Sequence, residues 1–185
     1  MVLTTRLKRA FPPVASPTAT VLILGSMPGE ASLRAQQYYA HPRNAFWSIL
    51  EAVTGVPAGA DYADRVAALS AAGIALWDVL HACEREGSLD AAIVDATSVP
   101  NDFTAFFRVH LAISRVLFNG AKAEQCFRRQ VMGRQEIPEG LQLIRLPSTS
   151  PAHAGVSRIH KQAAWAAALA SPGYNFPNDP AADFL

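Results

Sequence analysis

The sequence predicts an α/β protein, built as a three-layer α/β/α sandwich around a four-stranded parallel sheet. Four short apolar runs, at residues 21–25, 74–77, 113–118 and 141–146, are the expected strands. Such continuous apolar runs are typical of strands that are covered on both faces. Helical patterns separate successive runs, and alternation at this spacing indicates βαβ crossovers and a mostly parallel sheet.

Apolar positions three and four residues apart mark the helices between these strands. The first such stripe runs from Phe46 to Val53, and Asn44 is placed to cap it. Residues 83–100 are mixed and polar, and we expect an excursion with one short helix there. Further helices are expected at residues 62–72, after the caps Asn101 and Asp102, at 124–132 and at 160–169.

Length and composition indicate one globular domain over residues 1–185, with 1–20 as an extended lead-in and 171–185 as a loosely held tail. Half of the residues are hydrophobic and 17% are charged, which suits a sizeable core. The net charge is +1, so binding to nucleic acid would depend on a local basic patch. No apolar stretch is long enough to span a membrane.

The chain has two cysteines, Cys83 and Cys126, which lie far apart and form no CxxC motif. This argues against a zinc site or an iron–sulfur cluster, and we expect no metal and no cofactor. Sparse cysteines and the absence of a signal-peptide pattern fit a reducing cytoplasm.

Distinctive polar segments follow three of the four expected strands. They read GSMPGE from Gly25, FNGA around Asn119 and LPSTSPAHA from Leu146. Ligands of parallel sheets bind outside the carboxyl ends of the strands, so these segments are expected to converge on one cleft. Between the first strand and the first long helix lies YYAHPRNAFW, which supplies an aromatic ring, a histidine and an amide at Tyr39, His41 and Asn44.

With these segments in view, the sequence resembles the uracil-DNA glycosylase superfamily across roughly residues 20–170. GSMPG matches the place of that superfamily's first motif, and LPSTSPAHA resembles its second, a Pro-Ser loop that enters the DNA duplex. YAHPRNAFW is similar to a segment of the mismatch-specific uracil/thymine glycosylases. The three together look most like the hypoxanthine-DNA (deoxyinosine) glycosylase branch.

The resemblance implies a monofunctional DNA glycosylase of base excision repair that acts on double-stranded DNA. Its chief substrate would be hypoxanthine in deoxyinosine, with uracil as a second. Such an enzyme would flip the damaged nucleotide out of the helix before cleavage. We further expect a monomer, located in the cytoplasm with the nucleoid.

One departure from the superfamily pattern concerns the attacking water. Mismatch-specific relatives carry an Asn at the third position of GxxPG, where this chain has Met27 after Ser26. A thioether can neither orient nor deprotonate water. The hypoxanthine branch also lacks that residue, and the resemblance transfers the catalytic role to Asn44 and Asn119.

The resemblance also assigns the base pocket. Tyr39 would stack on the flipped base, Gly25, Ser26 and Met27 would approach it, and Asn119 would read it. A primary amide offers a donor and an acceptor, which match O6 and N1–H of hypoxanthine. Bland alternatives stay open: Tyr39 as a packed core residue, Asn119 in an Asn-Gly turn, and Asn44 as a helix cap alone.

The loop of the second motif is the expected DNA contact. Short hydroxyl groups and backbone N–H groups suit phosphates, and prolines stiffen a wedge. The alternative is a plain turn rich in Ser and Thr. Arg158, His160 and Lys161 could neutralise phosphates, or form only a solvated helix end. The residues assigned to DNA are Pro147, Ser148, Thr149, Ser150 and His153.

Three other functions remain compatible with the sequence. A glycosylase directed at uracil or mismatches would use the same fold and the same pocket. A DNA-binding module that has lost catalysis would explain Met27, although the retention of Tyr39, Asn44 and Asn119 argues against it. An unrelated α/β enzyme acting on a nucleotide or small metabolite would share only the sheet.

Overall fold

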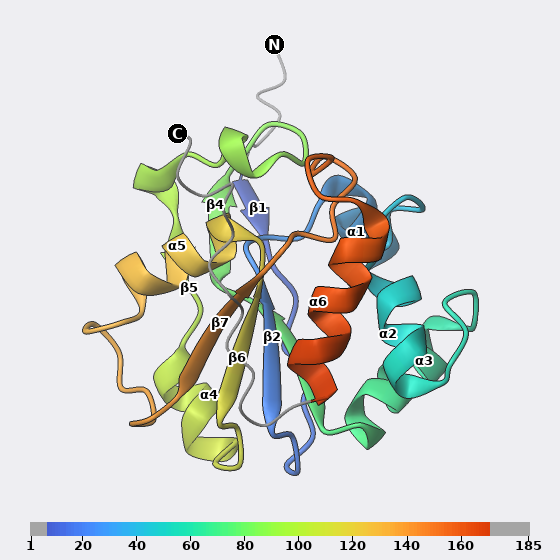
Figure 1. Cartoon of the computed structure of the whole chain (residues 1–185). Coiled ribbons are helices and arrows are strands. Elements are labelled where there is room, and N and C mark those ends of the chain that lie inside the picture. Colours follow the sequence, from blue (N-terminus) through green and yellow to red (C-terminus); the bar gives the residue numbers. More distant parts are fainter. Residues whose placement is uncertain (1–6, 171–185) are drawn as a thin grey trace.

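The computed structural model describes residues 7–170, and its centre is a four-stranded parallel sheet (Figure 1). The order is β3-β2-β6-β7, and all three neighbouring pairs are parallel. The predicted sheet is therefore confirmed, with each strand at or near its expected position. The strands are β2 (Val21–Gly25), β3 (Ile74–Asp78), β6 (Arg115–Asn119) and β7 (Gln142–Leu146).

Helices cover both faces of this sheet (Figure 1). On one face lie α2 (Phe46–Thr54), α3 (Tyr62–Ala71) and α6 (Arg158–Ala170). On the other lie α4 (Phe103–Val109) and α5 (Ala121–Gln130). This is the three-layer α/β/α arrangement that the alternation of strand and helix patterns predicts. None of the helices in residues 7–170 is long and apolar enough to cross a membrane.

The sequence of the central strand β2 is apolar without interruption because both of its faces are buried. Successive side chains of a strand point to opposite faces. Leu22 and Leu24 enter the core under α4 and α5, whereas Val21 and Ile23 enter the core under α2, α3 and α6. Each of these four side chains is at most 4% exposed. Burial of such a side chain stabilises the fold by about 1.5–3 kcal/mol.

The prediction of one short helix in residues 83–100 is wrong. A second, antiparallel sheet of order β1-β4-β5 forms here from β1 (Leu7–Arg9), β4 (Leu80–Glu84) and β5 (Val99–Pro100). Two 3₁₀ turns, η1 (Asp90–Ala92) and η2 (Asp95–Thr97), lie between β4 and β5. Strands of two to five residues leave little periodicity in a sequence, so pairing with distant residues decides the structure. The short helix α1 (Glu30–Ala35) was also not predicted.

The described part of the lead-in packs on the domain. β1 pairs with β4 from residue 7 onward. Val14 then exchanges two backbone hydrogen bonds with Leu76, at 2.7 and 2.8 Å, along the outer edge of β3. Residues 1–6 and the expected tail at 171–185 lie outside the described residues.

The carboxyl ends of β2 and β3 meet at a glycine. Gly25 and Asp78 are register partners. A Cβ placed on Gly25 would overlap Asp78 Oδ1 and would lie 3.2 Å from the hydroxyl oxygen of Tyr39. The absence of a side chain at Gly25 therefore makes room for a carboxyl group and a phenol at the rim of the sheet.

The change Gly25→Ala is expected to lower the free energy of unfolding by about 1–3 kcal/mol, because an added methyl group in a packed site forces its neighbours to move. Urea or thermal unfolding measures the loss. Gly59→Ala is the matched control, since a Cβ there meets nothing within 4 Å. Equal stability of the two variants would show that the side chains of Asp78 and Tyr39 can move away from the added methyl group without a loss of folding free energy.

Candidate active site

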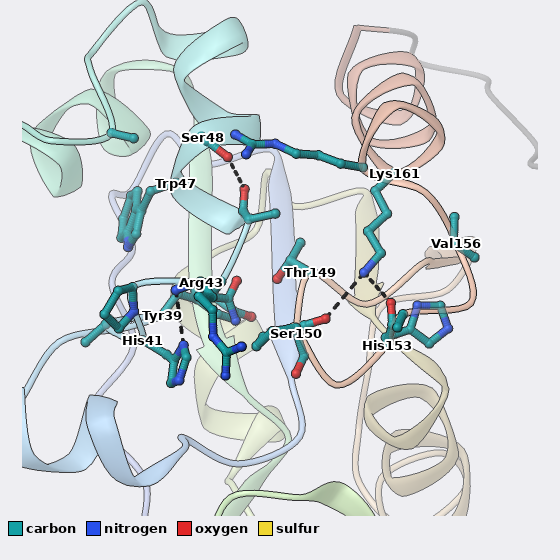
Figure 2. Close-up of a pocket in the computed structure, with 18 of the residues that line it drawn as sticks. Tyr39, His41, Arg43, Trp47, Ser48, Thr149, Ser150, His153, Val156 and Lys161 are labelled. Carbon is teal, nitrogen blue, oxygen red and sulfur yellow. Dashed lines mark hydrogen bonds between the residues drawn. The ribbon is translucent and has the colours of Figure 1, made fainter.

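A pocket of about 470 Å³ lies between the loop that precedes α2 and the loop that precedes α6 (Figure 2). Tyr39, His41 and Asn44 line it from the first loop. Thr149 and His153 line it from the second loop. The segments YAHPRNAFW and LPSTSPAHA, far apart in the chain, both line this pocket, whereas Gly25, Met27 and Asn119 do not.

The lining of this pocket is cationic. Arg43, Arg65, Arg158 and Lys161 contribute to it, and no Asp or Glu does. Arg65 is stacked on aromatic rings, with its guanidinium carbon 4.6 Å from the centroid of Trp47. A chain of net charge +1 therefore carries a strongly basic collar at one place, which suits phosphate groups. We call these four residues the basic collar.

Lys161 anchors the second loop to α6. Its side chain extends from α6 and donates hydrogen bonds to the carbonyl oxygens of Ser150, at 3.3 Å, and His153, at 2.6 Å (Figure 2). Lys161 is only 5% exposed, and burial lowers the pKa of its ammonium group. It is therefore an anchor of the loop, whereas Arg158 and His160 are exposed at the start of the helix.

Asn119 ties β6 to the same loop. Its Nδ2 donates to Thr149 Oγ1 at 2.9 Å, and its Oδ1 accepts from the backbone N–H of Thr149 at 2.8 Å. Both residues are buried. One of the two Nδ2 hydrogens is not used in this pair, so the amide keeps one donor for another partner.

The Asn-Gly pair does not form a tight turn between strands. Asn119 is the last residue of β6, and Gly120 directly precedes α5 with a φ of 97°. A Cβ on Gly120 would lie 3.0 Å from Ser148 Cβ. Gly120 thus permits both a left-handed backbone and the close approach of the second loop.

Tyr39 forms the inner wall of the pocket. Its ring stacks on Phe46 with centroids 3.9 Å apart, and its φ of 54° lies in the left-handed region. Its hydroxyl group is buried and has no hydrogen-bond partner within residues 7–170. Burial and the nearby Asp78 carboxyl group raise its pKa, and Asn119 partly offsets this. Tyr39 is thus both packed against the core and exposed to the pocket by one face.

Asn44 does cap the helix that follows. Its Oδ1 accepts from the backbone N–H of Phe46, the first residue of α2, at 3.0 Å. The amide nitrogen is not part of this bond, so capping leaves its donors available. Asn44 also lines the pocket. The structure therefore places it where either of its predicted roles is feasible.

The first motif is held by residues that sequence reasoning missed. Ser26 donates its hydroxyl hydrogen to Asp90, and the Met27 side chain packs in the core beneath α4 and α5. The guanidinium group of Arg85, 1% exposed, donates to the main-chain carbonyl oxygens of Met27 and Pro28. Arg85 and Asp90 come from residues 83–100, so this excursion fixes the Gly-rich turn.

Asp78 is a buried carboxyl group at the same rim. It is 4% exposed, and its Oδ2 makes no hydrogen bond to any of residues 7–170. Burial raises its pKa to about 7; Arg85 acts in the opposite direction and Asp90 raises it further. The side chain is thus largely neutral below pH 7, which is unusual for an aspartate.

Comparison with known proteins agrees with this arrangement. The sequence pattern of the uracil DNA glycosylase superfamily matches residues 12–170. This chain belongs to that superfamily. Proteins named hypoxanthine DNA glycosylase from Methanosarcina barkeri and Methanosarcina acetivorans are 41% and 38% identical over 117 and 118 residues. Each alignment spans 63% of this chain and 73% of the relative.

A solved structure shares the fold of this superfamily member. It is the solution NMR structure of a candidate uracil DNA glycosylase from Methanosarcina acetivorans, with a TM-score of 0.72 and 34% sequence identity. The match covers 88% of this chain and 96% of that one. The resemblance to the superfamily that the three motifs indicate is confirmed.

Asp78 was visible in the sequence as a carboxylate just beyond an apolar run, but nothing there revealed its burial. Within residues 7–170 no three His, Cys, Asp or Glu side chains lie close enough to hold a metal ion.

The stability of the protein is expected to depend on pH through Asp78. Its pKa is about 7 in the folded chain against 3.8 as an ordinary side chain, so the folded state binds more protons between these values. Stability from this group therefore falls as pH rises from about 4 to 7. Asp78→Asn removes the titration. Its free energy of unfolding, relative to that of the wild type, should rise by about 2–3 kcal/mol between pH 5 and pH 8.

Urea unfolding at both pH values measures this difference. Asp102→Asn is the control, because Asp102 is exposed and caps α4, where an asparagine serves equally well. A constant gap between Asp78→Asn and the wild type at pH 5 and pH 8 would show that Asp78 is ionised in the folded protein throughout.

Proposed function

We propose that the chain is a monofunctional DNA glycosylase that hydrolyses the N-glycosidic bond of deaminated bases in double-stranded DNA, chiefly hypoxanthine in deoxyinosine. Relatives named hypoxanthine DNA glycosylase support this substrate. The observation that carries the proposal is a basic pocket whose inner wall is Tyr39, beside the strand-end amide of Asn119 and the buried carboxyl group of Asp78. Base excision repair requires these elements: cations for the backbone, a ring for the base and polar groups for its edge.

In this proposal the basic collar and the second loop hold the DNA backbone. Arg43, Arg65 and Arg158 neutralise phosphates on either side of the flipped nucleotide. Lys161 keeps the loop in shape from behind. The loop residues assigned to DNA are Pro147, Ser148, Thr149, Ser150 and His153.

The flipped base would stack on Tyr39 and approach the main chain of Gly25, Ser26 and Met27. Asn119 would donate its remaining N–H to the base, since its other polar contacts already go to Thr149. A hydrogen-bond donor there stabilises the negative charge that the departing base acquires. Stacking on an aromatic ring adds about 1–3 kcal/mol.

Water is the proposed nucleophile, held by the free amide donors of Asn44. The alternative nucleophile in the pocket is Lys161, because a lysine of lowered pKa can form a Schiff base with the sugar. Its ammonium group, however, already donates to two carbonyl oxygens. This favours hydrolysis without strand cleavage by the enzyme. We expect the chain to act as a monomer in the cytoplasm, on DNA of the nucleoid.

A duplex with one deoxyinosine tests the proposal. The wild type should produce an abasic site, visible as a strand break only after alkali, with activity retained in chelator and no cross-link after borohydride reduction. Parallel duplexes with one uracil rank the two bases. Tight binding without cleavage of either duplex would instead establish a DNA-binding module that has lost catalysis, the alternative that Met27 suggests.

The role of Asn119 can be separated from its structural bonds. Asn119→Ala should slow single-turnover cleavage of deoxyinosine on the order of a hundredfold, since loss of one donor to a developing anion typically costs about 2.7–4 kcal/mol. Thr149→Val removes the hydroxyl acceptor of Asn119 but keeps the backbone N–H donor. It is expected to change the rate by less than about tenfold.

Thermal unfolding of both variants accompanies the kinetics. Equal losses of rate in the two variants, with equal losses of stability, would assign Asn119 to anchoring the loop and would end its role in reading the base.

A further inference from the structure

Two buried polar atoms without partners lie at the carboxyl edge of the sheet. They are the hydroxyl oxygen of Tyr39 and Oδ2 of Asp78. The two side chains adjoin, because an added Cβ on Gly25 would meet Oδ1 of Asp78 and the hydroxyl oxygen of Tyr39. Native proteins contain few unpaired buried polar groups, because each one is costly. Two on adjoining side chains indicate a site whose polar partner arrives with a ligand.

These two side chains lie next to the pocket. Tyr39 lines the pocket with its ring, while its hydroxyl group reaches inward to Gly25 and Asp78. Asn119 adjoins the same hydroxyl group. Asp78 therefore lies directly behind the inner wall of the pocket, at the end of the strand next to β2.

Asn119 alone offers too little to recognise a base edge. Its carbonyl oxygen accepts from Thr149, and one of its amide hydrogens goes to Thr149 Oγ1. It keeps one donor, which can meet O6 of hypoxanthine but leaves N1–H unmatched. The unpartnered oxygen of Asp78, behind the pocket wall, is an available acceptor.

We propose that the carboxyl group of Asp78 determines base specificity by pairing with O6 and N1–H of the flipped hypoxanthine. This rests on the proposed glycosylase function and adds a residue to it. The hydroxyl of the acid donates to O6, and its carbonyl oxygen accepts from N1–H. Uracil presents the same pair at O4 and N3–H. Adenine places an amino group where Asn119 also points a donor, and is therefore rejected.

The neutral form matters for the chemistry as well as for recognition. Negative charge grows on the base as the N-glycosidic bond breaks. A carboxylic acid stabilises that charge by its hydrogen bond, and a buried acid held neutral is a known way to do this. A carboxylate at the same point would repel the departing base and would have no hydrogen to donate.

The surroundings of Asp78 favour the acid over most of the range below neutrality. Burial is the largest influence, Asp90 on η1 acts in the same direction, and Arg85 beyond β4 acts against them. Tyr38 and Tyr39, from the loop before α2, carry neutral hydroxyl groups, since the pKa of each is raised. Together these place the pKa of Asp78 at about 7.

Access to Asp78 requires Tyr39 to move aside. Tyr39 is held at a φ of 54°, a left-handed conformation that is unfavourable for a residue with a side chain. A base that entered would replace the buried phenol next to Asp78 and would stack on the displaced ring. The unpaired oxygen of Asp78 would then gain a partner.

The test is single-turnover cleavage of a deoxyinosine duplex between pH 5.5 and pH 9. The wild-type rate should fall about tenfold per pH unit above pH 7. Asp78→Asn keeps one donor and one acceptor in the same volume and cannot ionise. It should match the wild type within a few-fold at pH 6, and its rate should not fall between pH 7 and pH 9. Asp78→Ala should be slower on the order of a hundredfold at pH 6.

The asparagine variant separates this role from a structural one and from the histidines of the pocket. A decline of its rate parallel to the wild type would assign the titration to a group other than Asp78 and overturn the proposal. So would a hundredfold loss at every pH. A wild type that cleaves neither deoxyinosine nor uracil duplexes would refute the proposed function itself.

Discussion

The structure depends most on the contact between Gly25 and Asp78 at the carboxyl ends of two neighbouring strands. Parallel pairing puts the two residues side by side, and the missing side chain of Gly25 leaves a space that Asp78 and Tyr39 share. The backbone continues the pairing beyond the strands, because the N–H of Val79 donates to the carbonyl oxygen of Gly25 at 2.8 Å. A carboxyl group is thereby fixed in the protein interior, where burial disfavours its charged form.

Two buried cations shape the loops around this contact in the same manner. Arg85 donates to the carbonyl oxygens of the first motif, and Lys161 donates to those of the second. Neither forms an ion pair with a carboxylate among residues 7–170 that would fix it elsewhere. Main-chain carbonyls satisfy the hydrogen bonds of a cation without cancelling its charge. The loops are consequently anchored, and the region retains the positive charge that a polyanion requires.

How far the sequence predicts this site depends on the range of the interactions involved. The four strands and the cap at Asn44 follow from local pattern, because continuous apolar runs and capping residues act within a few positions. The convergence of the motifs follows from parallel topology. The prediction for the excursion at 83–100 is wrong, because its short strands depend on the pairing of β4 with β1 on one side and with β5 on the other. Burial of Arg85 and Asp78 was equally invisible, since charged residues are rarely buried and only tertiary packing reveals the exception.

The site combines two electrostatic environments. One suits binding of the DNA backbone, and the other suits departure of the base. The outer pocket carries the basic collar without a carboxylate, and this attracts the backbone of DNA despite a net charge of +1 for the whole chain. Asp78 behind the inner wall is buried, and in such an environment of low dielectric each hydrogen bond to a departing base would be strengthened. An ionised Asp78 would repel the negative charge that develops on the departing base. Because burial keeps Asp78 neutral, the pocket can bind a polyanion and also stabilise an anionic leaving group.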